Sequence, residues 1–538
     1  MTKNTIVLSI IAIFCLAIFT ACGRRSPSET SEHSTQIADA QNRNITTPPM
    51  SSTLTDILNN ALIRREDITR PSKADLIPLT TGREVTMSEH DIAYYRLSFF
   101  NRYTSPDQLP YDTNVPLVNY DVDLFFSSLS SLYAQYIYFG GDEVFLPIRD
   151  HIMYTIEQRT HWEPYELEEL LYESLSPVIV DSVFHLGNRR FRGGMEILQY
   201  NRQFSRSENG FFCTEHELYV YELVLQCIPD LYINIQDSFR FSMDESGEIF
   251  FYTLVIALPA PANEFPVYYL QIVYEDGTYE IVPLDMLASI RSRGDRRPIS
   301  NFYPPSFEVM QGIPVVAIEI FGLLSLDDTL FGATLIPQSS RSARQFLDIA
   351  EQLRDEPVFI LDLRNNGGGY GLLADQWLHQ LTGYIIPPNF NNLAISSYND
   401  HVEWFIETAG QYHPIPTFFD ENHTTLILPP CEVIANDQLI IVLVDRFTAS
   451  AGERMVDFAF SMENVLVIGQ NTGGAYISGN GRINSALPWS NIPFGFSFDM
   501  RVPPEGHFQE GIGFAPDIWV MGDALTAALN MLNHHIED

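Results

Sequence analysis

A serine flanked by alanines lies where a predicted strand ends and a predicted helix begins. The strand covers residues 439–444 and the helix starts near residue 449. Ser450 would therefore sit at a sharp turn with a helix N-terminus behind its hydroxyl, which favours a nucleophile. Ser450 and Glu453 also have the spacing of a capping box, so an ordinary helix start accounts for the same residues.

A glycine-rich turn, residues 362–369, follows a second apolar strand. Its glycines do not have the spacing of a dinucleotide-binding turn, and no lysine follows, as a phosphate-binding loop requires. Because glycines leave backbone N–H groups unobstructed, the turn could hold a developing oxyanion. The carboxyl ends of neighbouring strands meet at one edge of an α/β sheet, so we expect the turn and Ser450 to come together there.

The segment 306–538 alternates between apolar strands and helices. This alternation predicts an α/β core whose sheet is covered on both faces. The predicted strands cover residues 315–320, 358–363, 439–444 and 465–468, and a predicted helix covers residues 341–353.

Two further regions precede this core. Residues 53–205 are rich in aromatic side chains and mostly helical in pattern, which predicts a helical N-terminal cap. Residues 206–305 predict an inserted β-rich module that forms a separate unit. The module contains strand-like runs at 218–221, 250–255 and 267–273, and an Asp-Gly hairpin turn at 276–277.

Together these segments resemble the tail-specific, or C-terminal-processing, serine protease family. Residues 362–369 are similar to its D-L-R-x-N-x-G-G motif and residues 448–453 to its T-A-S-A-x-E nucleophile motif. Residues 468–474 and 510–518 are similar to its Thr-Gly-Gly loop and its terminal E-G-x-G-x-x-P-D-I segment. The resemblance covers about 306–538, with a weaker match near 130–190.

The resemblance implies a crotonase-like (ClpP-like) protease core that hydrolyses peptide or protein substrates through an acyl-enzyme. Ser450 would be the nucleophile. The N–H groups of Ala451 and of Gly368 or Gly369 would form the oxyanion hole.

The general base is the open question. Processing proteases of the family use a lysine 25 residues after the serine, and this position is Ala475. The chain contains only two lysines, Lys3 and Lys73, and both precede the core. A Ser–Lys dyad within the core is therefore excluded.

The tricorn-like branch of the family instead uses serine, histidine and glutamate. Glu510 matches the glutamate, but the expected histidine position is Val183, and a histidine occurs two residues later, at His185. Residues 183 and 185 of a strand share one face and lie roughly 6–7 Å apart. His185 could therefore act only if the strand slips or bulges by two residues. His507, near Glu510, is a second candidate, and a structural role for His185 is equally compatible with the sequence.

The apolar residue at the base position supports an alternative function. A catalytically inactive protein with the protease fold would bind peptides or envelope components without turnover. A lipid carrier related to the interphotoreceptor retinoid-binding protein is a third interpretation, which rests on fold analogy alone.

The N-terminus has the pattern of a lipoprotein signal peptide. Lys3 precedes an apolar run, residues 5–21, which ends at Cys22. Cleavage there would leave Cys22 to carry lipid, and the polar residues 23–52 would form a flexible tether to the cell envelope. A retained transmembrane anchor is the alternative, because the run is about long enough to span a bilayer.

Charge and cysteine content limit the partners and cofactors. The chain has 31 basic and 68 acidic residues, a net charge of −37, which disfavours nucleic acid. Neither CxxC nor HExxH occurs, so we predict no catalytic metal and no cofactor. Cys213 and Cys227 could form a disulfide, and Cys431 would remain.

Overall fold

The computed structural model of this 538-residue chain describes residues 48–66, 68, 117–191, 195–225, 234–259, 268–286, 304–321, 337–369, 371–383, 391–394, 418–419, 425–427, 433–479, 482–497, 499–520 and 522–536. The predicted signal peptide, Cys22 and most of the predicted tether lie outside these residues, as do Cys227 and Cys431. Within the described ranges, no helix has both the length and the apolar character needed to cross a bilayer.

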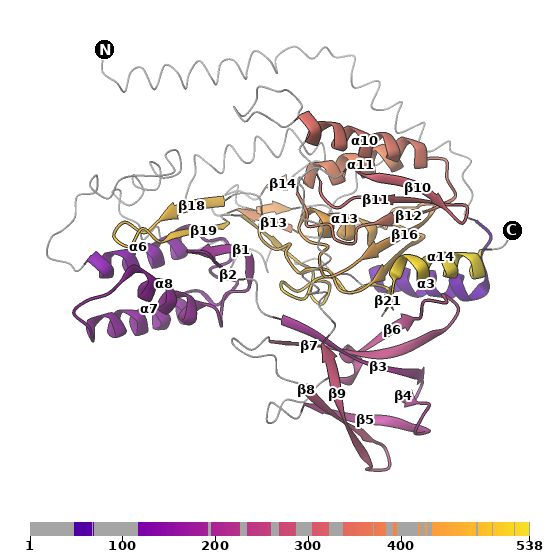
Figure 1. The fold of residues 1–538 in the computed structure, drawn as a ribbon, viewed down its shortest axis with the longest axis horizontal. Helices are drawn as coiled ribbons and strands as arrows, with labels where there is room; N and C mark the ends of the chain where they lie inside the picture. Colours follow the sequence, from indigo (N-terminus) through magenta and orange to yellow (C-terminus); the bar gives the residue numbers. More distant parts are fainter. Residues whose placement is uncertain are drawn as a thin grey trace.

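Parallel strands form the centre of the protein (Figure 1). In spatial order they are β11 (Ile313–Ala317), β12 (Val358–Asp362), β16 (Leu439–Val444), β17 (Val465–Gly469) and β21 (Ile518–Val520), with β10 (Ser306–Met310) antiparallel at the edge. Every residue of β12, β16 and β17 is buried. This burial explains why these strands are continuous apolar runs rather than alternating ones.

Helices cover both faces of the central sheet, as the sequence predicts (Figure 1). Alternate residues of β16 divide between the two sides: Ile441 and Leu443 face one layer, and Val442 and Val444 face the other. The first layer contains α3 (Ser52–Glu66) and α14 (Ala524–His535). The second contains α10 (Pro337–Leu353), α11 (Gly371–Thr382) and α13 (Ala451–Ala459).

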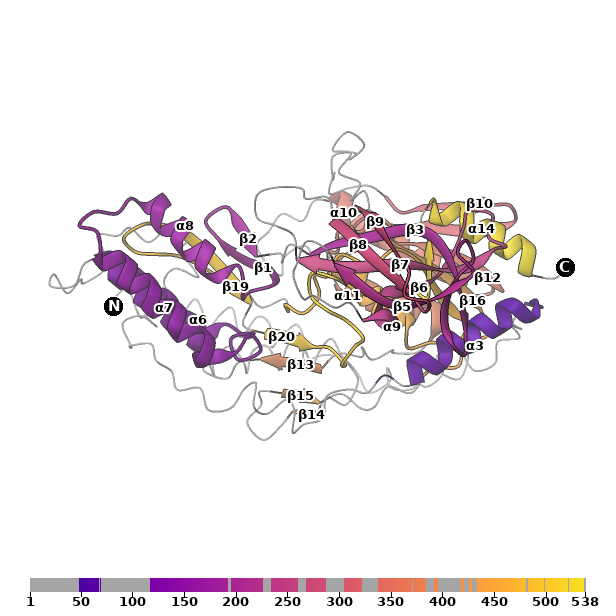
Figure 2. The same ribbon diagram turned by 90° about the horizontal axis from the view of Figure 1, so that it is seen from below.

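The cap lies at one end of the molecule, away from the central sheet (Figure 2). It contains α6 (Leu117–Leu132), α7 (Gly141–Glu157), α8 (Pro164–Leu175), β1 (Asp181–Leu186) and β2 (Arg189–Phe191). Two strands from the C-terminal part of the chain complete its sheet, in the order β18 (Arg482–Ala486), β19 (Pro493–Ser497), β1, β2. In turn α3, which the sequence assigns to the cap, packs on the central sheet through Leu54 and Leu58.

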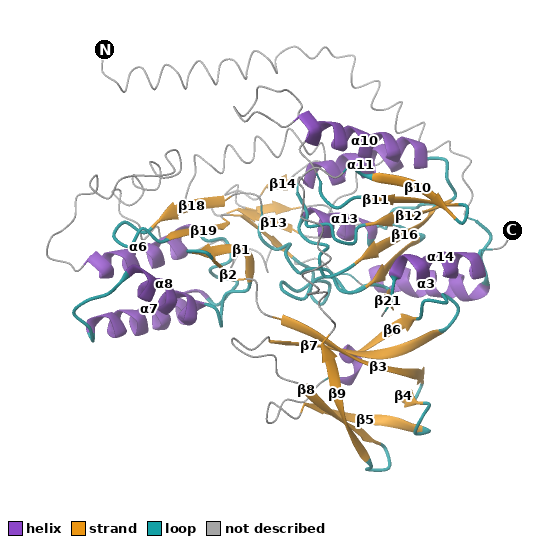
Figure 3. Ribbon diagram, in the orientation of Figure 1, coloured by secondary structure: helices purple, strands orange, loops and turns teal. Residues whose placement is uncertain are grey.

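The β-rich module begins at Met195, before the predicted boundary at residue 206. Figure 3 shows that strands make up nearly all of it. Its elements are β3 (Met195–Ser207), β4 (Gly210–Cys213), β5 (Leu218–Leu225), α9 (Ile235–Ser238), β6 (Phe239–Met243), β7 (Phe250–Pro259), β8 (Tyr268–Tyr274) and β9 (Tyr279–Met286). The predicted Asp-Gly hairpin turn joins β8 to β9, with Gly277 at φ 82°.

The module is not a separate sheet. Strand β6 lies parallel to β21, so the module's strands continue the central sheet. Trp519 of β21 is fully buried against Ile197 and Val255 of the module. A small further sheet contains β13 (Asn391–Ala394), β14 (Phe418–Phe419), β15 (Thr425–Ile427) and β20 (Asp499–Val502).

Candidate active site

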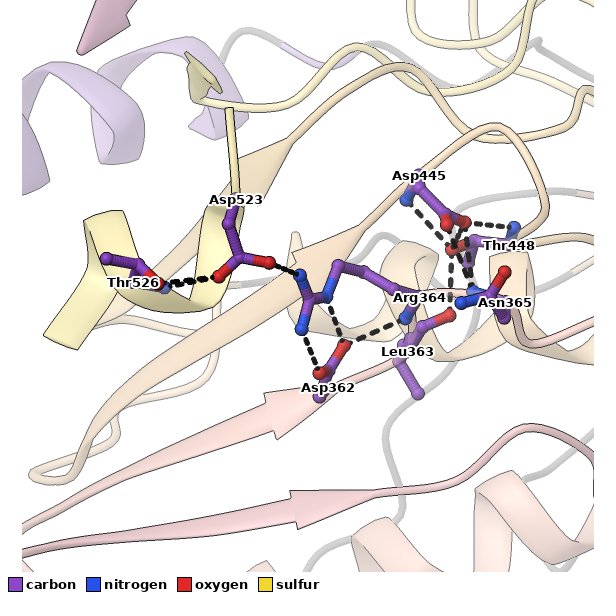
Figure 4. A network of polar contacts seen from close by, with 8 residues as sticks. All are labelled: Asp362, Leu363, Arg364, Asn365, Asp445, Thr448, Asp523 and Thr526. Atoms are coloured by element: carbon purple, nitrogen blue, oxygen red, sulfur yellow. Dashed lines mark hydrogen bonds and ion pairs between the residues drawn. The ribbon is translucent and has the colours of Figure 1, made fainter. Parts of the chain in front are cut away.

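The glycine-rich turn and the serine turn meet at the carboxyl edge of β12 and β16, as predicted (Figure 4). The Asn365 N–H donates to the Asp445 carboxylate at 3.0 Å, and the Thr448 hydroxyl donates to the Leu363 carbonyl at 2.9 Å. These bonds fix the two turns against each other because side chains of the serine turn satisfy backbone groups of the glycine-rich turn.

A second part of this network ties β12 to α14 (Figure 4). The Arg364 guanidinium donates to both oxygens of Asp362, at 2.9 and 2.7 Å, and to Asp523 at 2.8 Å. Asp523 also accepts a hydrogen bond from the Thr526 N–H and so caps α14. Arg364 therefore anchors the end of β12 to the helix layer.

Ser450 has a strained backbone. Its φ of 55° and ψ of −112° lie outside the regions that residues with a side chain favour. The residue stands directly before α13, and a sharp strand-to-helix turn of this kind exposes a nucleophile. Strain at a non-glycine residue persists only where the surrounding structure enforces it, and it is typical of active sites.

Glu453 holds this turn in place. Its side chain is fully buried, and one carboxylate oxygen accepts hydrogen bonds from the N–H groups of Ser450 and Ala475, at 3.0 and 2.9 Å. The other oxygen accepts from the Thr472 hydroxyl at 2.6 Å and the Gly474 N–H at 2.7 Å. Burial raises the pKa of Glu453, and these four bonds oppose that rise. The sequence signal for this residue was its capping-box spacing, which does not reveal the loop partners.

The two glycines of the predicted oxyanion hole differ in their hydrogen bonding. The Gly368 N–H donates to the Asn366 side chain at 2.9 Å. Neither the Gly369 N–H nor the Ala451 N–H donates to any residue that the structure describes. Of the two glycines, Gly369 is therefore the one whose N–H has no acceptor among the described residues. Both glycines require positive φ, 98° and 124°.

Glu510 is buried beside the first residues of β1. Its carboxylate accepts hydrogen bonds from the N–H groups of Ser182 at 3.3 Å, Tyr476 at 3.0 Å and Ile477 at 2.9 Å. Burial, with the nearby charge of Asp181, raises the pKa of Glu510 to about 8. Asp181 is also buried, and it accepts hydrogen bonds from the hydroxyls of Tyr133 and Ser478.

The segment 474–477 lies between the two buried glutamates. The N–H groups of Gly474 and Ala475 donate to Glu453, and those of Tyr476 and Ile477 donate to Glu510. Ala475 therefore lies beside the serine turn, at the position where processing proteases of the resembled family have lysine. A methyl group there supplies no base.

His185 lies on β1, half-buried, opposite Gly495 of β19 and Arg190 of β2. The pairing of β1 with β2 is irregular just before it: Asp181 pairs with Phe191, and His185 with the adjacent residue, Arg190. Four steps along β1 thus correspond to one along β2. The sequence predicts that His185 can replace the histidine expected at position 183 only if the strand slips or bulges, and the register shift in β1 is an irregularity of this kind. Glu510 contacts this strand at Ser182.

His507 lies at the other end of α13 from Ser450. Its Nε2 atom is 3.5 Å from the Asp457 carboxylate, and its ring packs against Phe460 and Phe514. Asp457 follows Ser450 by seven residues, which corresponds to about 10 Å along a helix axis. The structure therefore associates the second candidate base with the interior of α13 rather than with the nucleophile turn.

No group of three or more His, Cys, Asp or Glu side chains in the described part of the chain could hold a metal ion. Cys213 is buried and unpaired among these residues.

Residues 321–520 match the sequence profile of Peptidase family S41. The chain contains an S41 peptidase domain. S41 is a family of serine peptidases, and the matched residues of this S41 domain include both strand-end turns and Glu510. A comparison with curated proteins found no match.

Solved structures resemble the chain at low sequence identity. A structure of mature CPAF complexed with lactacystin is 14% identical, with 78% of this chain and 98% of that chain covered and a TM-score of 0.39. The photosystem II D1 C-terminal processing protease is 12% identical, with 76% and 94% covered and a TM-score of 0.33. A putative peptidase from Parabacteroides merdae is 14% identical, with 71% and 88% covered and a TM-score of 0.32.

Proposed function

We propose that this protein is a serine peptidase that cleaves polypeptides with Ser450 as nucleophile. The observation that carries the proposal is the strained backbone of Ser450 at the start of α13, held by the buried carboxylate of Glu453. Strain of this kind costs about 1–3 kcal/mol and is retained mainly where function needs it. The S41 domain match supports the same reaction class.

In the proposed reaction, the Ser450 hydroxyl attacks the carbonyl carbon of the scissile peptide bond. The oxyanion of the tetrahedral intermediate accepts hydrogen bonds from the N–H groups of Ala451 and Gly369. Collapse of the intermediate releases the amine product and leaves an acyl-enzyme, which water then hydrolyses. The Asn366–Gly368 hydrogen bond supports this role by holding the glycine turn in one conformation.

His185 is the proposed general base, and Glu510 is its proposed orienting partner. The irregular pairing between Asp181 and His185 supports this role, since bulges of this kind re-aim the side chains of a strand. Glu510 supports it through its contact with Ser182 on the same strand. The histidine would accept the Ser450 proton and return it to the leaving amine.

A catalytically inactive protein that binds peptides is the second candidate. The observation that favours it is the apolar residue at both base positions of the resembled family, Val183 and Ala475. Ala475 is bound to the same Glu453 oxygen as Ser450, so it lies beside the nucleophile without offering a base.

The proposed location is the cell envelope, where the protein would be exported and tethered through lipid on Cys22. The support is the signal-like sequence that ends at this cysteine and the polar segment after it. The substrates would then be envelope or extracellular polypeptides.

Labelling with a fluorophosphonate probe tests the reaction, because the probe modifies only an activated serine. We expect the wild-type protein to be labelled, and Ser450→Ala and His185→Ala to be equally unlabelled, since the residues act as a unit. Labelling of wild type that survives His185→Ala would refute the histidine assignment. A wild-type protein that resists the probe while remaining folded would favour the inactive alternative.

A further inference from the structure

Strands β3, β4, β5, β8 and β9 close into a small barrel, because β9 pairs with β3 as well as with β8. Buried side chains, among them Leu223, Ile272 and Leu284, form its core. Strands β5, β8 and β9 make one wall of the barrel. Figure 1 shows that the hairpin turn joining β8 to β9 lies at the end of the module away from the central sheet. The core of the barrel is therefore complete without the residues that point outward from this wall.

Large aromatic and aliphatic side chains cover the outer face of this wall. Along β8 and β9 buried residues alternate with more exposed ones, as they do where only one face of a sheet packs on a core. On the outer face, Tyr279 of β9 lies opposite Val273 of β8. The large side chains exposed on the three strands are Tyr221 (71% exposed), Tyr269 (45%), Tyr279 (62%) and Ile281 (52%). We call these four side chains the barrel patch.

A bulge in β5 brings Tyr221 into the same face. The pairing of β5 with β8 shifts between Val220 and Glu222, so that Tyr221 and Glu222 together lie opposite Val273. Val273 is therefore flanked by Tyr221 on one side and by Tyr279 on the other. The barrel patch thus extends across three neighbouring strands, and contiguous apolar surface of this kind marks an interaction site, whereas single exposed apolar residues do not.

The charged residues of this wall are all acidic. Segment 218–225 contains one acidic residue and segment 268–286 contains four, and neither contains Lys, Arg or His. Glu280 forms an ion pair with Arg202 of β3. Three others have no ion-pair partner in the described part of the chain: Glu222, Glu275 and Asp276. A molecule that covers the barrel patch therefore meets uncompensated negative charge, which favours cationic groups.

The same charge disfavours the other occupants of an apolar face. A two-fold interface with a second copy would set this acidic surface against itself, in a chain whose net charge is already −37. Anionic membrane lipids would be repelled in the same way. Exposed tyrosine rings instead attract Lys and Arg side chains through cation–π contacts, which contribute about 0.5–1 kcal/mol each at exposed sites. A polypeptide with cationic and apolar side chains fits both features.

We propose that the barrel patch is a docking surface for a partner polypeptide in which Lys or Arg residues flank large apolar side chains. The apolar side chains of the partner would pack against the barrel patch, and burial of this surface would supply most of the affinity. The cations would approach the three unpaired acidic residues and favour this partner over neutral or acidic ones. The inference goes beyond the proposed function and does not depend on the reactivity of Ser450.

The test is equilibrium binding of dye-labelled heptapeptides to the full chain carrying Ser450→Ala, so that the proposed activity cannot cleave the probes. Lys-Arg-Leu-Phe-Leu-Arg-Lys has an apolar centre between cations. Glu-Asp-Leu-Phe-Leu-Asp-Glu reverses the charges, and Lys-Arg-Ser-Ser-Ser-Arg-Lys removes the apolar centre. Fluorescence anisotropy should show that the first peptide binds about tenfold more tightly than either of the others, because only it offers both kinds of contact.

Removal of the barrel patch should remove this preference. The double variant Tyr279→Thr/Ile281→Thr keeps β-branched residues that suit a strand, and it should weaken binding of the first peptide about tenfold. Tyr221→Thr/Tyr269→Thr removes the patch on the other two strands and replaces the first pair if the thermal midpoint of that variant falls. Glu222→Gln should weaken binding of the first peptide and leave the charge-reversed peptide no weaker than before.

The matched control is Tyr154→Ala, which removes a tyrosine that is 62% exposed on α7 and should leave all three affinities unchanged. Equal affinity for the three peptides, no measurable binding, or binding that survives both double variants would overturn the inference. Self-association or binding to phosphatidylcholine vesicles that Tyr279→Thr/Ile281→Thr abolishes would assign the patch to a second copy or to lipid, and either result would also overturn it. Fluorophosphonate labelling of the protein with Ser450 intact reports separately on the proposed function, so the two failures are distinguishable.

Discussion

A Cβ atom on Gly368 would lie 2.6 Å from the Cβ atom of Ser450. Contacts this short do not occur between real side chains, so the glycine turn can approach the nucleophile only because residue 368 has no side chain. The same Cβ would lie 3.1 Å from the Ala451 nitrogen, whose N–H is part of the proposed oxyanion hole. The absence of a side chain at Gly368 therefore allows both the Ser450 side chain and the Ala451 N–H to lie close to the glycine turn.

Gly368→Ala should slow fluorophosphonate labelling of Ser450 by about 10²-fold, because displacement of a reacting group by roughly 1 Å has an effect of that size. Gly367→Ala is the matched control, since a Cβ there meets no atom within 4 Å. Labelling rates of both variants, with thermal midpoints to confirm folding, check the prediction. An unchanged rate in Gly368→Ala would show that the turn does not touch the reacting serine.

Glu453→Gln should destabilise the protein by about 2–5 kcal/mol, because a buried acceptor of four hydrogen bonds gains an N–H₂ group that faces donors. Urea unfolding at pH 7 measures the effect. Glu505→Gln, at an exposed glutamate, is the control and should be neutral. If Glu453→Gln unfolds at the wild-type urea midpoint, the carboxylate does not hold the serine turn and the 472–475 loop together.

Ala475→Lys should place an amine beside Ser450, because residue 475 shares a Glu453 oxygen with the serine. If the natural protein lacks a base, probe labelling should rise by about 10²–10⁴-fold, the usual contribution of a general base. Ala475→Met provides a chain of similar length without the charge and should give no rise. Val183→His tests the other base position in the same assay. Failure of both variants would mean that more than the base is missing.

Stability should fall as pH rises from about 4.5 to about 8, because Glu510 is protonated more readily in the folded state than in the unfolded chain. Its raised pKa favours folding below the unfolded value, and this contribution is lost as pH rises through the folded value. Glu510→Gln keeps a neutral group and should flatten the profile between these pH values. Urea unfolding at several pH values checks this. A wild-type slope identical to that of Glu510→Gln would contradict the raised pKa.

Cys22→Ala should abolish labelling with radioactive fatty acid and shift the protein from the detergent phase to the aqueous phase. The reason is that the cysteine is the expected site of lipid attachment. Cys15→Ala, within the predicted signal peptide, is the control and should leave both properties unchanged. Lipid labelling that persists in Cys22→Ala would refute the assignment.

The sequence by itself determined the core of this protein and the position of its two strand-end turns. Apolar strands that alternate with helices can bury their residues only in a sheet covered on both faces, and Ile441 and Val442 lie on its opposite faces accordingly. Parallel strands place their carboxyl ends at one edge, which brought Asn365 to Asp445. The absence of lysine from the core is also a property of the sequence alone.

Only the tertiary structure decided how the parts of the site support one another. Glu453 has the spacing of a helix cap, but its partners Thr472 and Gly474 come from a loop about twenty residues away, and no local pattern encodes such a contact. The cap likewise depends on β19, which lies some three hundred residues from β1 in the chain.

Local periodicity identifies an element and its buried face, but it carries no information about which distant element that face will meet. The difference in hydrogen bonding between the two glycines of the proposed oxyanion hole likewise depends on the tertiary structure. Gly368 and Gly369 are adjacent and chemically identical, but the folded chain places Gly368 beside Ser450 and the Asn366 side chain, which accepts its N–H, and places Gly369 beside Phe321.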